Sequence, residues 1–259
     1  MSLEIKSKEN PVYKELKKIS REKNPYVLVE GKKLFFEAKN SSLKIEKVFI
    51  DDKNKQLFSN LLSDNNIEVI YMDNNLIASV FTTDSKPEAE DLIVALAKRP
   101  PWHINELFKT KKNIVLLENI QDPGNLGAII RSSLAFNTGG IILFGRSVDS
   151  FNTKVVRASA GAVFHLPVVR VENIDQIKEL TKKEDYKIIG TFSKAKKTIS
   201  EVNKDLPNVF LFGNEGSGLS KQLQDLSDEV VAIPHSTKVE SLNLGVAVSI
   251  VLWELQRRK

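Results

Sequence analysis

Hydrophobic and polar positions alternate along the first hundred residues in a way that predicts strands and helices in turn. Short apolar runs with the length and composition of buried strands lie at 26–30, 45–51, 67–72 and 91–97. Segments with apolar residues at helical spacing lie at 12–23, 31–40, 55–65 and 74–81. This alternation predicts an α/β domain over residues 1–97.

The sequence Lys98-Arg99-Pro100-Pro101 interrupts the pattern, because consecutive prolines continue neither a strand nor a helix. We therefore expect a linker over residues 98–112 and a second domain over residues 113–259.

The second domain repeats the alternation. Strands that are apolar throughout are expected at 113–118, 139–145, 186–192, 208–213 and 229–234. Helices are expected at 126–136, 153–160 and 174–183, after Gly218, and from Ser241 to the C-terminus. Fully apolar strands separated by helices predict a parallel sheet covered on both faces. In such sheets ligands bind beyond the carboxyl ends of the strands.

Composition narrows the possible chemistry. The 259 residues include no cysteine and three histidines, so disulfides and cysteine-ligated metals are excluded and we expect no metal site. No apolar stretch approaches the roughly 20 residues that span a bilayer, and the N-terminus lacks a signal-like apolar region. We expect a cytoplasmic protein without a membrane segment. The net charge of +5 suggests a polyanionic partner, although a solvated basic helix face explains single lysines as well.

Three polar clusters follow predicted strands. The first, DPGNLGAIIRSS, contains Asn125 and Arg131. Asn125 is either a helix N-cap or a ligand contact. Arg131 suits a phosphate clamp because its planar guanidinium pairs with phosphate oxygens; the alternative is an ion pair with an internal carboxylate.

The second cluster, GNEGSG, surrounds Glu215 with glycines. The spacing of its glycines matches neither the dinucleotide-binding fingerprint nor the P-loop. Two interpretations stay open: the glycines form a tight turn, or they let the backbone approach a flat ligand closely. The third cluster places Ser241 and Asn243 before a helix that is hydrophobic on all sides. Ser241 is either the N-cap of this helix or a ligand contact, and the helix is a candidate oligomer interface.

Together, in this order, the clusters resemble the three signature motifs of the SpoU/TrmH family, which are SPOUT-class RNA ribose 2′-O-methyltransferases. The matching motifs are Asn-x-Gly…Arg, Gly-Asn-Glu-Gly-x-Gly-Leu and Ile-Pro…Ser-Leu-Asn, within residues 113–255. The N-terminal half is similar to the family's substrate-binding domain, which resembles ribosomal protein L30e, chiefly in VLVEGKKLFFEA at 27–38. Thr237 departs from the family's usual glycine in the third motif.

The resemblance implies a SPOUT domain with a deep trefoil knot, a homodimer, and S-adenosyl-L-methionine as cofactor. It implies that the following residues contact the cofactor: Thr191, Gly213, Ile233 and Leu242. It implies catalytic or active-site roles for Asn125, Arg131, Glu215, Ser241 and Asn243. The family view makes the arginine a general base. A guanidinium keeps its proton at pH 7, so we expect Arg131 to orient the hydroxyl and the adjacent phosphate.

The predicted activity is therefore methylation of a ribose 2′-hydroxyl in structured RNA, with 23S ribosomal RNA favoured over transfer RNA. Two alternatives belong to other functional classes. A non-catalytic RNA-binding protein, such as a ribosome-assembly factor, would retain the fold without the motif residues. A nucleotide-dependent enzyme acting on a small molecule would carry a phosphate-binding loop, and none is present.

Overall fold

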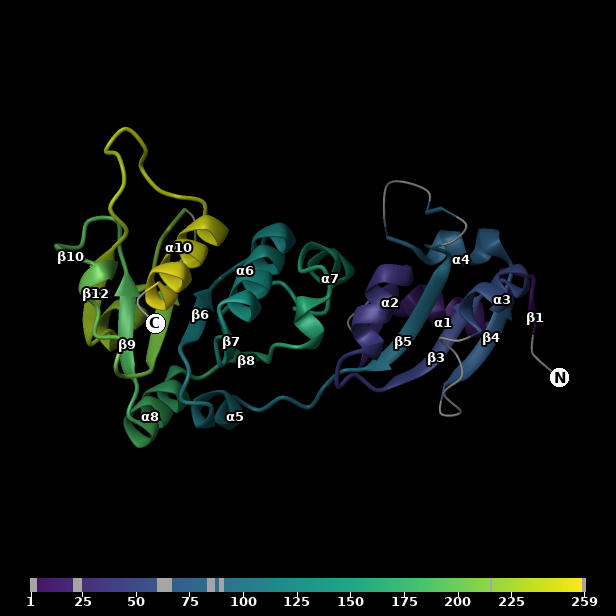
Figure 1. Cartoon of the computed structure of the whole chain (residues 1–259), viewed down its shortest axis with the longest axis horizontal. Coiled ribbons are helices and arrows are strands. Elements are labelled where there is room, and N and C mark those ends of the chain that lie inside the picture. Colours follow the sequence, from purple (N-terminus) through teal and green to yellow (C-terminus); the bar gives the residue numbers. More distant parts are fainter. Residues whose placement is uncertain are drawn as a thin grey trace. The chain divides into compact units, whose positions relative to one another are not determined.

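The computed structural model describes residues 4–20, 25–59, 67–82, 87–88, 91–214 and 216–257. By its internal contacts the chain divides into two units (Figure 1). Unit 1 comprises Met1–Pro101 and Phe151–Phe164, and unit 2 comprises Trp102–Ser150 and His165–Lys259. No helix within the described ranges has the length and apolar composition needed to cross a membrane.

Unit 1 is built on a mixed five-stranded sheet in the order β1-β4-β3-β5-β2. Its strands are β1 (Glu4–Ile5), β2 (Tyr26–Glu30), β3 (Ile45–Ile50), β4 (Glu68–Met72) and β5 (Ile93–Lys98). Strand β5 runs antiparallel to both of its neighbours, whereas β1, β4 and β3 are parallel. The α-helices between them are α1 (Pro11–Ile19), α2 (Lys32–Lys39), α3 (Lys55–Phe58) and α4 (Asn74–Val80).

A segment from the second half of the sequence completes unit 1. It contains helix α7 (Thr153–Ala158) and a 3-10 turn at Ala162–Phe164. The guanidinium of Arg157 donates to the carboxylate of Glu30 on β2 at 2.8 Å and to the hydroxyl of Thr82 at 2.6 Å. Because the Glu30 side chain is only 2% exposed, Arg157 compensates a buried charge.

Unit 2 has a seven-stranded sheet in which every neighbouring pair is parallel, in the order β10-β12-β9-β11-β6-β7-β8. The strands are β6 (Ile114–Glu118), β7 (Gly140–Phe144), β8 (Val168–Val171), β9 (Lys187–Thr191), β10 (Lys197–Thr198), β11 (Asn208–Phe212) and β12 (Glu229–Ala232). The α-helices are α5 (Ile104–Lys109), α6 (Pro123–Ala135), α8 (Ile174–Glu184), α9 (Lys221–Leu226) and α10 (Leu244–Gln256).

Both faces of this sheet are covered, which explains why its strands are apolar throughout. Alternate residues such as Ile114 and Leu116 pack with α5, α8 and α9 in one core cluster. The intervening Val115 and Leu117 are also fully buried and face the other side. Helices α6 and α10 pack together, with the hydroxyls of Ser132 and Ser249 2.8 Å apart.

The predicted α/β alternation is confirmed, and three strands and one α-helix of the described residues were not expected. Strands β1 and β10 have only two residues each, which is too short to leave a hydrophobic pattern. Strand β8, with the sequence VVRV, was not predicted either. The expected linker over 98–112 contains helix α5, whose residues Leu107 and Phe108 are fully buried in the core of unit 2.

Candidate active site

A cavity of about 510 Å³ opens beyond the carboxyl ends of β9, β11 and β12. Three of the predicted cofactor residues line it where these strands end: Thr191, Gly213 and Ile233. The predicted residues Ser241 and Leu242 line it from the loop before α10. Five predicted site residues that are far apart in sequence thus share one hollow of the molecule.

The loop after β11 is held in a closed turn. Asn214 and Gly218 form a two-way backbone bridge, in which the Gly218 amide donates to the Asn214 carbonyl at 2.8 Å and the Asn214 amide donates to the Gly218 carbonyl at 3.2 Å. A β-carbon added at Gly213 would lie 2.0 Å from the backbone carbon of Gly218. Glycine is therefore required at 213 for the chain to cross itself this closely.

Asn214 fastens this loop to the neighbouring strand. Its side-chain amide donates to the carbonyl of Asn119, just after β6, at 3.1 Å, and its Oδ1 accepts from the Gly216 amide at 2.9 Å. The predicted catalytic residue Glu215 lies outside the described residues.

The starts of α6 and α10 meet through two predicted asparagines. The Asn243 Nδ2 donates to Asn125 Oδ1 at 3.0 Å. Asn243 is the N-cap of α10, since its Oδ1 accepts from the Val246 amide at 3.2 Å. The N-cap of α6 is Asp122, which accepts from the Asn125 amide at 2.7 Å. The alternative roles of Asn125 and Ser241 as N-caps are therefore wrong.

Arg131 lies exposed on α6 and forms no ion pair with any of the described residues. The alternative interpretation, an ion pair with an internal carboxylate, therefore finds no partner in that part of the chain. Arg131, Asn125 and Asn243 are not among the residues that line the cavity. The structure thus gathers the cofactor residues and Ser241 in the hollow and brings Asn125 and Asn243 together beside it.

Four polar residues of the cavity were not singled out from the sequence: Ser193, Gln224, His235 and Glu240. The Nδ1 of His235 lies 2.7 Å from the Ile233 carbonyl, so it carries the proton of this hydrogen bond. Gln224 donates to the Leu219 carbonyl at 2.7 Å. They are not among the residues that define the three motifs, and a single sequence does not mark such neighbouring positions as part of a site.

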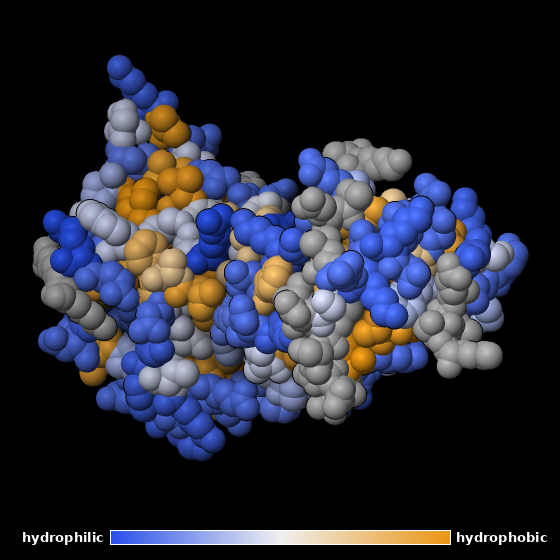
Figure 2. Space-filling view, turned by 45° about the vertical axis from the view of Figure 1, so that its right-hand side comes forward, coloured by the Kyte–Doolittle hydropathy of each residue, from blue (hydrophilic) through white to orange (hydrophobic). Residues whose placement is uncertain are grey.

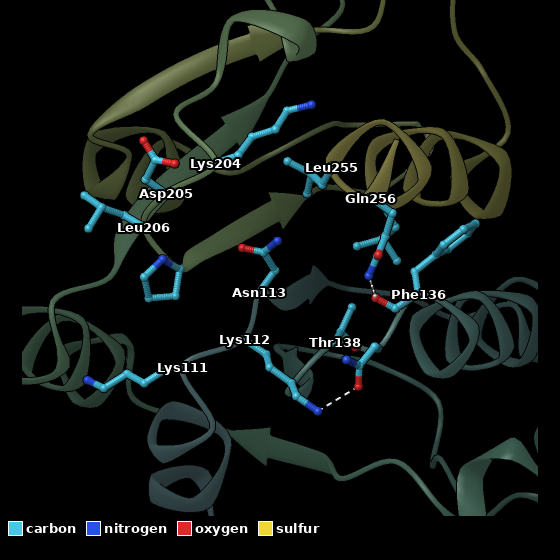
Figure 3. A pocket seen from close by; sticks show the side chains of 13 residues that line it. Lys111, Lys112, Asn113, Phe136, Thr138, Lys204, Asp205, Leu206, Leu255 and Gln256 are labelled. Carbon is cyan, nitrogen blue, oxygen red and sulfur yellow. Dashed lines mark hydrogen bonds between the residues drawn. The ribbon is translucent and has the colours of Figure 1, made fainter. Parts of the chain in front are cut away.

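A smaller cavity of about 190 Å³ lies at the opposite, amino edge of the same sheet (Figure 3). Residues preceding β6, β7 and β11 line it, together with the C-terminal end of α10. None of the predicted site residues lies there. No group of three or more His, Cys, Asp or Glu side chains suited to a metal occurs in the described part of the chain.

Comparison with known proteins identifies the family. The model of the SpoU rRNA Methylase family matches residues 112–253, which is more than half of the chain. The chain belongs to this family. The match covers the sheet of unit 2 and all three polar clusters.

Individual SpoU relatives match over different lengths. The chain is 29% identical over 98% of its length, and 99% of the relative's, to the 23S rRNA (guanosine(2553)-2′-O)-methyltransferase RlmP of Bacillus subtilis. It is 37% identical over 56% of its length to an uncharacterized tRNA/rRNA methyltransferase of Synechocystis, of which it spans about half, 53%.

Among solved structures, the SpoU methyltransferase AviRb from Streptomyces viridochromogenes, in complex with the cofactor AdoMet, superposes with a TM-score of 0.87. The identity is 26%, and the match covers 96% of this chain and 98% of AviRb. The α/β fold with its parallel sheet is thus the fold of a SpoU methyltransferase. The likeness of unit 1 to ribosomal protein L30e stays a prediction.

Proposed function

We propose that this SpoU protein transfers a methyl group from S-adenosyl-L-methionine to a ribose 2′-hydroxyl in RNA. The observation that carries the proposal is the convergence of Thr191, Gly213, Ile233, Ser241 and Leu242 on one cavity at the carboxyl edge of the sheet. The AdoMet bound to AviRb and the 2′-O-methyltransferase activity in the name of RlmP support it.

The cavity fits the proposed cofactor in size and chemistry. Small-molecule sites commonly enclose about 300–1,000 Å³, and this cavity of about 510 Å³ falls in that range. Ile233 and Leu242 provide apolar walls for the adenine ring, and the side-chain-free Gly213 lets the ligand approach the backbone. When bound, S-adenosyl-L-methionine supplies a methyl group activated by its sulfonium.

The remaining motif residues would position the ribose. The bonded pair Asn125 and Asn243, with Ser241 at the cavity, offers donors and acceptors for hydroxyl groups. We assign to Arg131 the orientation of the 2′-hydroxyl and the neighbouring phosphate, because its guanidinium is exposed and has no ion-pair partner among the described residues. Glu215 is proposed to join this group, since its motif is complete in the sequence. Positioning of this kind supplies much of the rate of an in-line transfer.

We further propose 23S ribosomal RNA as the substrate, in keeping with the full-length similarity to RlmP. Transfer RNA and a non-catalytic role in ribosome assembly are the alternatives. A homodimer is proposed from the exposed hydrophobic side chains Val246 and Trp253 on α10 and Leu134 on α6. We also propose that unit 2 contains a trefoil knot and that the protein is cytoplasmic.

The test compares 2′-O-methyl sites in ribosomal and transfer RNA between a wild-type strain and a strain that lacks the gene. The proposal expects one ribose methylation in 23S RNA to disappear and to return with the wild-type gene. A methylation lost from transfer RNA would replace the substrate assignment. If no methylation is lost and S-adenosyl-L-methionine does not bind in a calorimetric titration, the protein is not an active methyltransferase.

A further inference from the structure

Basic side chains without anionic partners follow the carboxyl ends of three strands of unit 2. Arg146 follows β7, Lys194 and Lys196 follow β9, and Lys238 lies in the loop after β12. All four are exposed, and none forms an ion pair within the described ranges of the chain. We call these four residues the basic rim.

Basic residues at the amino edge of the same sheet are arranged differently. Lys111, Lys187 and Lys204 form ion pairs with Glu184, Glu229 and Glu254, at 2.9, 3.0 and 3.3 Å. The fourth, Lys112, donates to the side-chain oxygen of Asn137 at 2.7 Å (Figure 3). These four cations at the amino edge thus have polar partners, whereas the four residues of the basic rim form no ion pair with the described residues.

Carboxylates at the carboxyl edge are mostly engaged elsewhere. Glu118 accepts from the Ser220 amide at 2.7 Å, and Asp122 caps α6. Glu240 lines the cavity. None of these three carboxylates forms an ion pair with the basic rim in the described part of unit 2.

The basic rim lies beside the proposed cofactor cavity. Ser193, which lines the cavity, immediately precedes Lys194, and Lys238 lies between the cavity residues His235 and Glu240. The loop that carries Lys238 projects beyond α10 and β12 (Figure 1). The corresponding projection at the top of the space-filling view is hydrophilic at its tip (Figure 2).

The spacing of the basic rim suits an extended polyanion. In the order β12-β9-β11-β6-β7, four strand spacings separate β12, the strand that precedes Lys238, from β7, the strand that precedes Arg146. At ~4.8 Å per spacing this is about 19 Å, which exceeds one phosphate group and spans several linked ones. The three lysines lie toward the β9 and β12 side, and Arg146 lies toward the β7 side.

We propose that the basic rim holds the RNA backbone on both sides of the nucleotide that is methylated. The lysines bind phosphates on one side of the cavity and Arg146 binds a phosphate on the other, so the ribose between them faces the cofactor. This inference rests on the proposed function, and it assigns RNA contacts to the catalytic unit itself. Such contacts are independent of base sequence, because lysine and arginine neutralise phosphate charge.

The test measures binding of the full-length protein to a fluorescein-labelled single-stranded oligouridylate by fluorescence anisotropy over a range of salt concentrations. The variant carries Lys194→Gln, Lys196→Gln and Lys238→Gln. The control carries Lys178→Gln, Lys182→Gln and Lys183→Gln, which removes the same charge from exposed positions on α8.

Each phosphate contact to single-stranded RNA contributes about 0.7 to the slope of log affinity against log salt. We therefore expect the slope of the rim variant to fall by about 2. The α8 variant should keep the wild-type slope, and Arg146→Gln alone should lower it by about 0.7. A calorimetric titration with S-adenosyl-L-methionine should give the wild-type affinity for both triple variants.

An equal loss of slope in both triple variants would mean that only net charge matters and would overturn the proposal. An unchanged slope in the rim variant would overturn it as well, and binding of the rim to an acidic protein instead would then be the next hypothesis. Neither result bears on methyl transfer, which is tested separately by cofactor binding and by methyl mapping with the wild-type protein.

Discussion

At the scale of single residues, the site depends on a few positions where backbone and side-chain geometry leave little freedom. Gly213 and Asn243 are the clearest cases, because the first permits a backbone crossing and the second makes two different hydrogen bonds. For each of these two residues the structure predicts the effect of a substitution.

Gly213→Ala should weaken cofactor binding. The new methyl group would lie 2.0 Å from the backbone carbon of Gly218 and 2.2 Å from the Leu219 amide nitrogen, so the loop that lines the cavity must change its conformation. We expect the affinity for S-adenosyl-L-methionine to fall at least about tenfold, or about 1.4 kcal/mol, in a calorimetric titration. Gly216→Ala is the matched control, because the nearest atom to its added β-carbon is 3.5 Å away. Equal affinities for the two variants would contradict the assignment.

Asn243 caps α10 with one hydrogen bond and contacts Asn125 with another. Two substitutions distinguish the effects of these two bonds. Asn243→Ala loses both, and the missing N-cap should lower the free energy of unfolding by about 1 kcal/mol. Asn243→Asp keeps an oxygen that can cap α10 but loses the donor to Asn125. It should unfold like the wild type in urea and lose about 10²-fold in methyl transfer, since misplacement of the ribose costs rate. Wild-type activity in Asn243→Asp would exclude the Asn125 contact from the site.

Arg131→Ala should lower the rate of methyl transfer without changing the affinity for the cofactor. The side chain is exposed and outside the cavity, so stability and cofactor affinity should stay at wild-type values. Methyl transfer should fall by at least about 10²-fold because the 2′-hydroxyl and its phosphate lose their orienting group. Arg131→Lys should recover part of the activity at most, since an ammonium lacks the planar fork. Full activity in Arg131→Ala would rule out the assigned role.

At the scale of secondary-structure elements, the sequence predicted most of unit 2 because its strands are buried on both faces and form unbroken apolar runs. The motif residues at strand ends could be placed at one edge for the same reason, since all strands of this sheet are parallel. The start of α6 was placed too late, because Asp122-Pro123 begins the helix before its apolar positions do. Gln224, His235 and Glu240 were not found, because only the folded loops bring them to the cavity.

The element that the sequence placed least well is the segment containing α7. A helix over 153–160 was expected, but its packing on unit 1 depends on Arg157 reaching Glu30, 127 residues away in sequence. Such an ion pair leaves no local pattern. Its effect on stability can be measured.

Arg157→Met should destabilise the protein by about 3 kcal/mol, because it leaves the carboxylate of Glu30 buried without its cation. Adding Glu30→Gln should recover most of this loss. Burial already raises the pKa of Glu30, and losing Arg157 removes an interaction that lowers it. The folded state of Arg157→Met therefore binds a proton more readily than the unfolded state, and its deficit should shrink as the pH falls through the raised pKa. Urea unfolding at several pH values checks this, and a deficit independent of pH would contradict it.

At the scale of the whole molecule, the protein combines a SpoU methylase sheet, which has a cavity at its carboxyl edge, with a second α/β unit. Family membership comes from the match over residues 112–253, and the full-length similarity to RlmP extends over both units. The trefoil knot, the dimer and the L30e-like character of unit 1 remain predictions of the family resemblance.

The central claim is that the protein binds S-adenosyl-L-methionine in this cavity and transfers its methyl group to a ribose in 23S RNA. The most direct measurement is a map of 2′-O-methyl sites in RNA from a deletion strain complemented with the wild-type gene or with Arg131→Ala. We expect one site in 23S RNA to be lost on deletion, to return with the wild-type gene and not to return with Arg131→Ala. An unchanged methylation map in the deletion strain would contradict it.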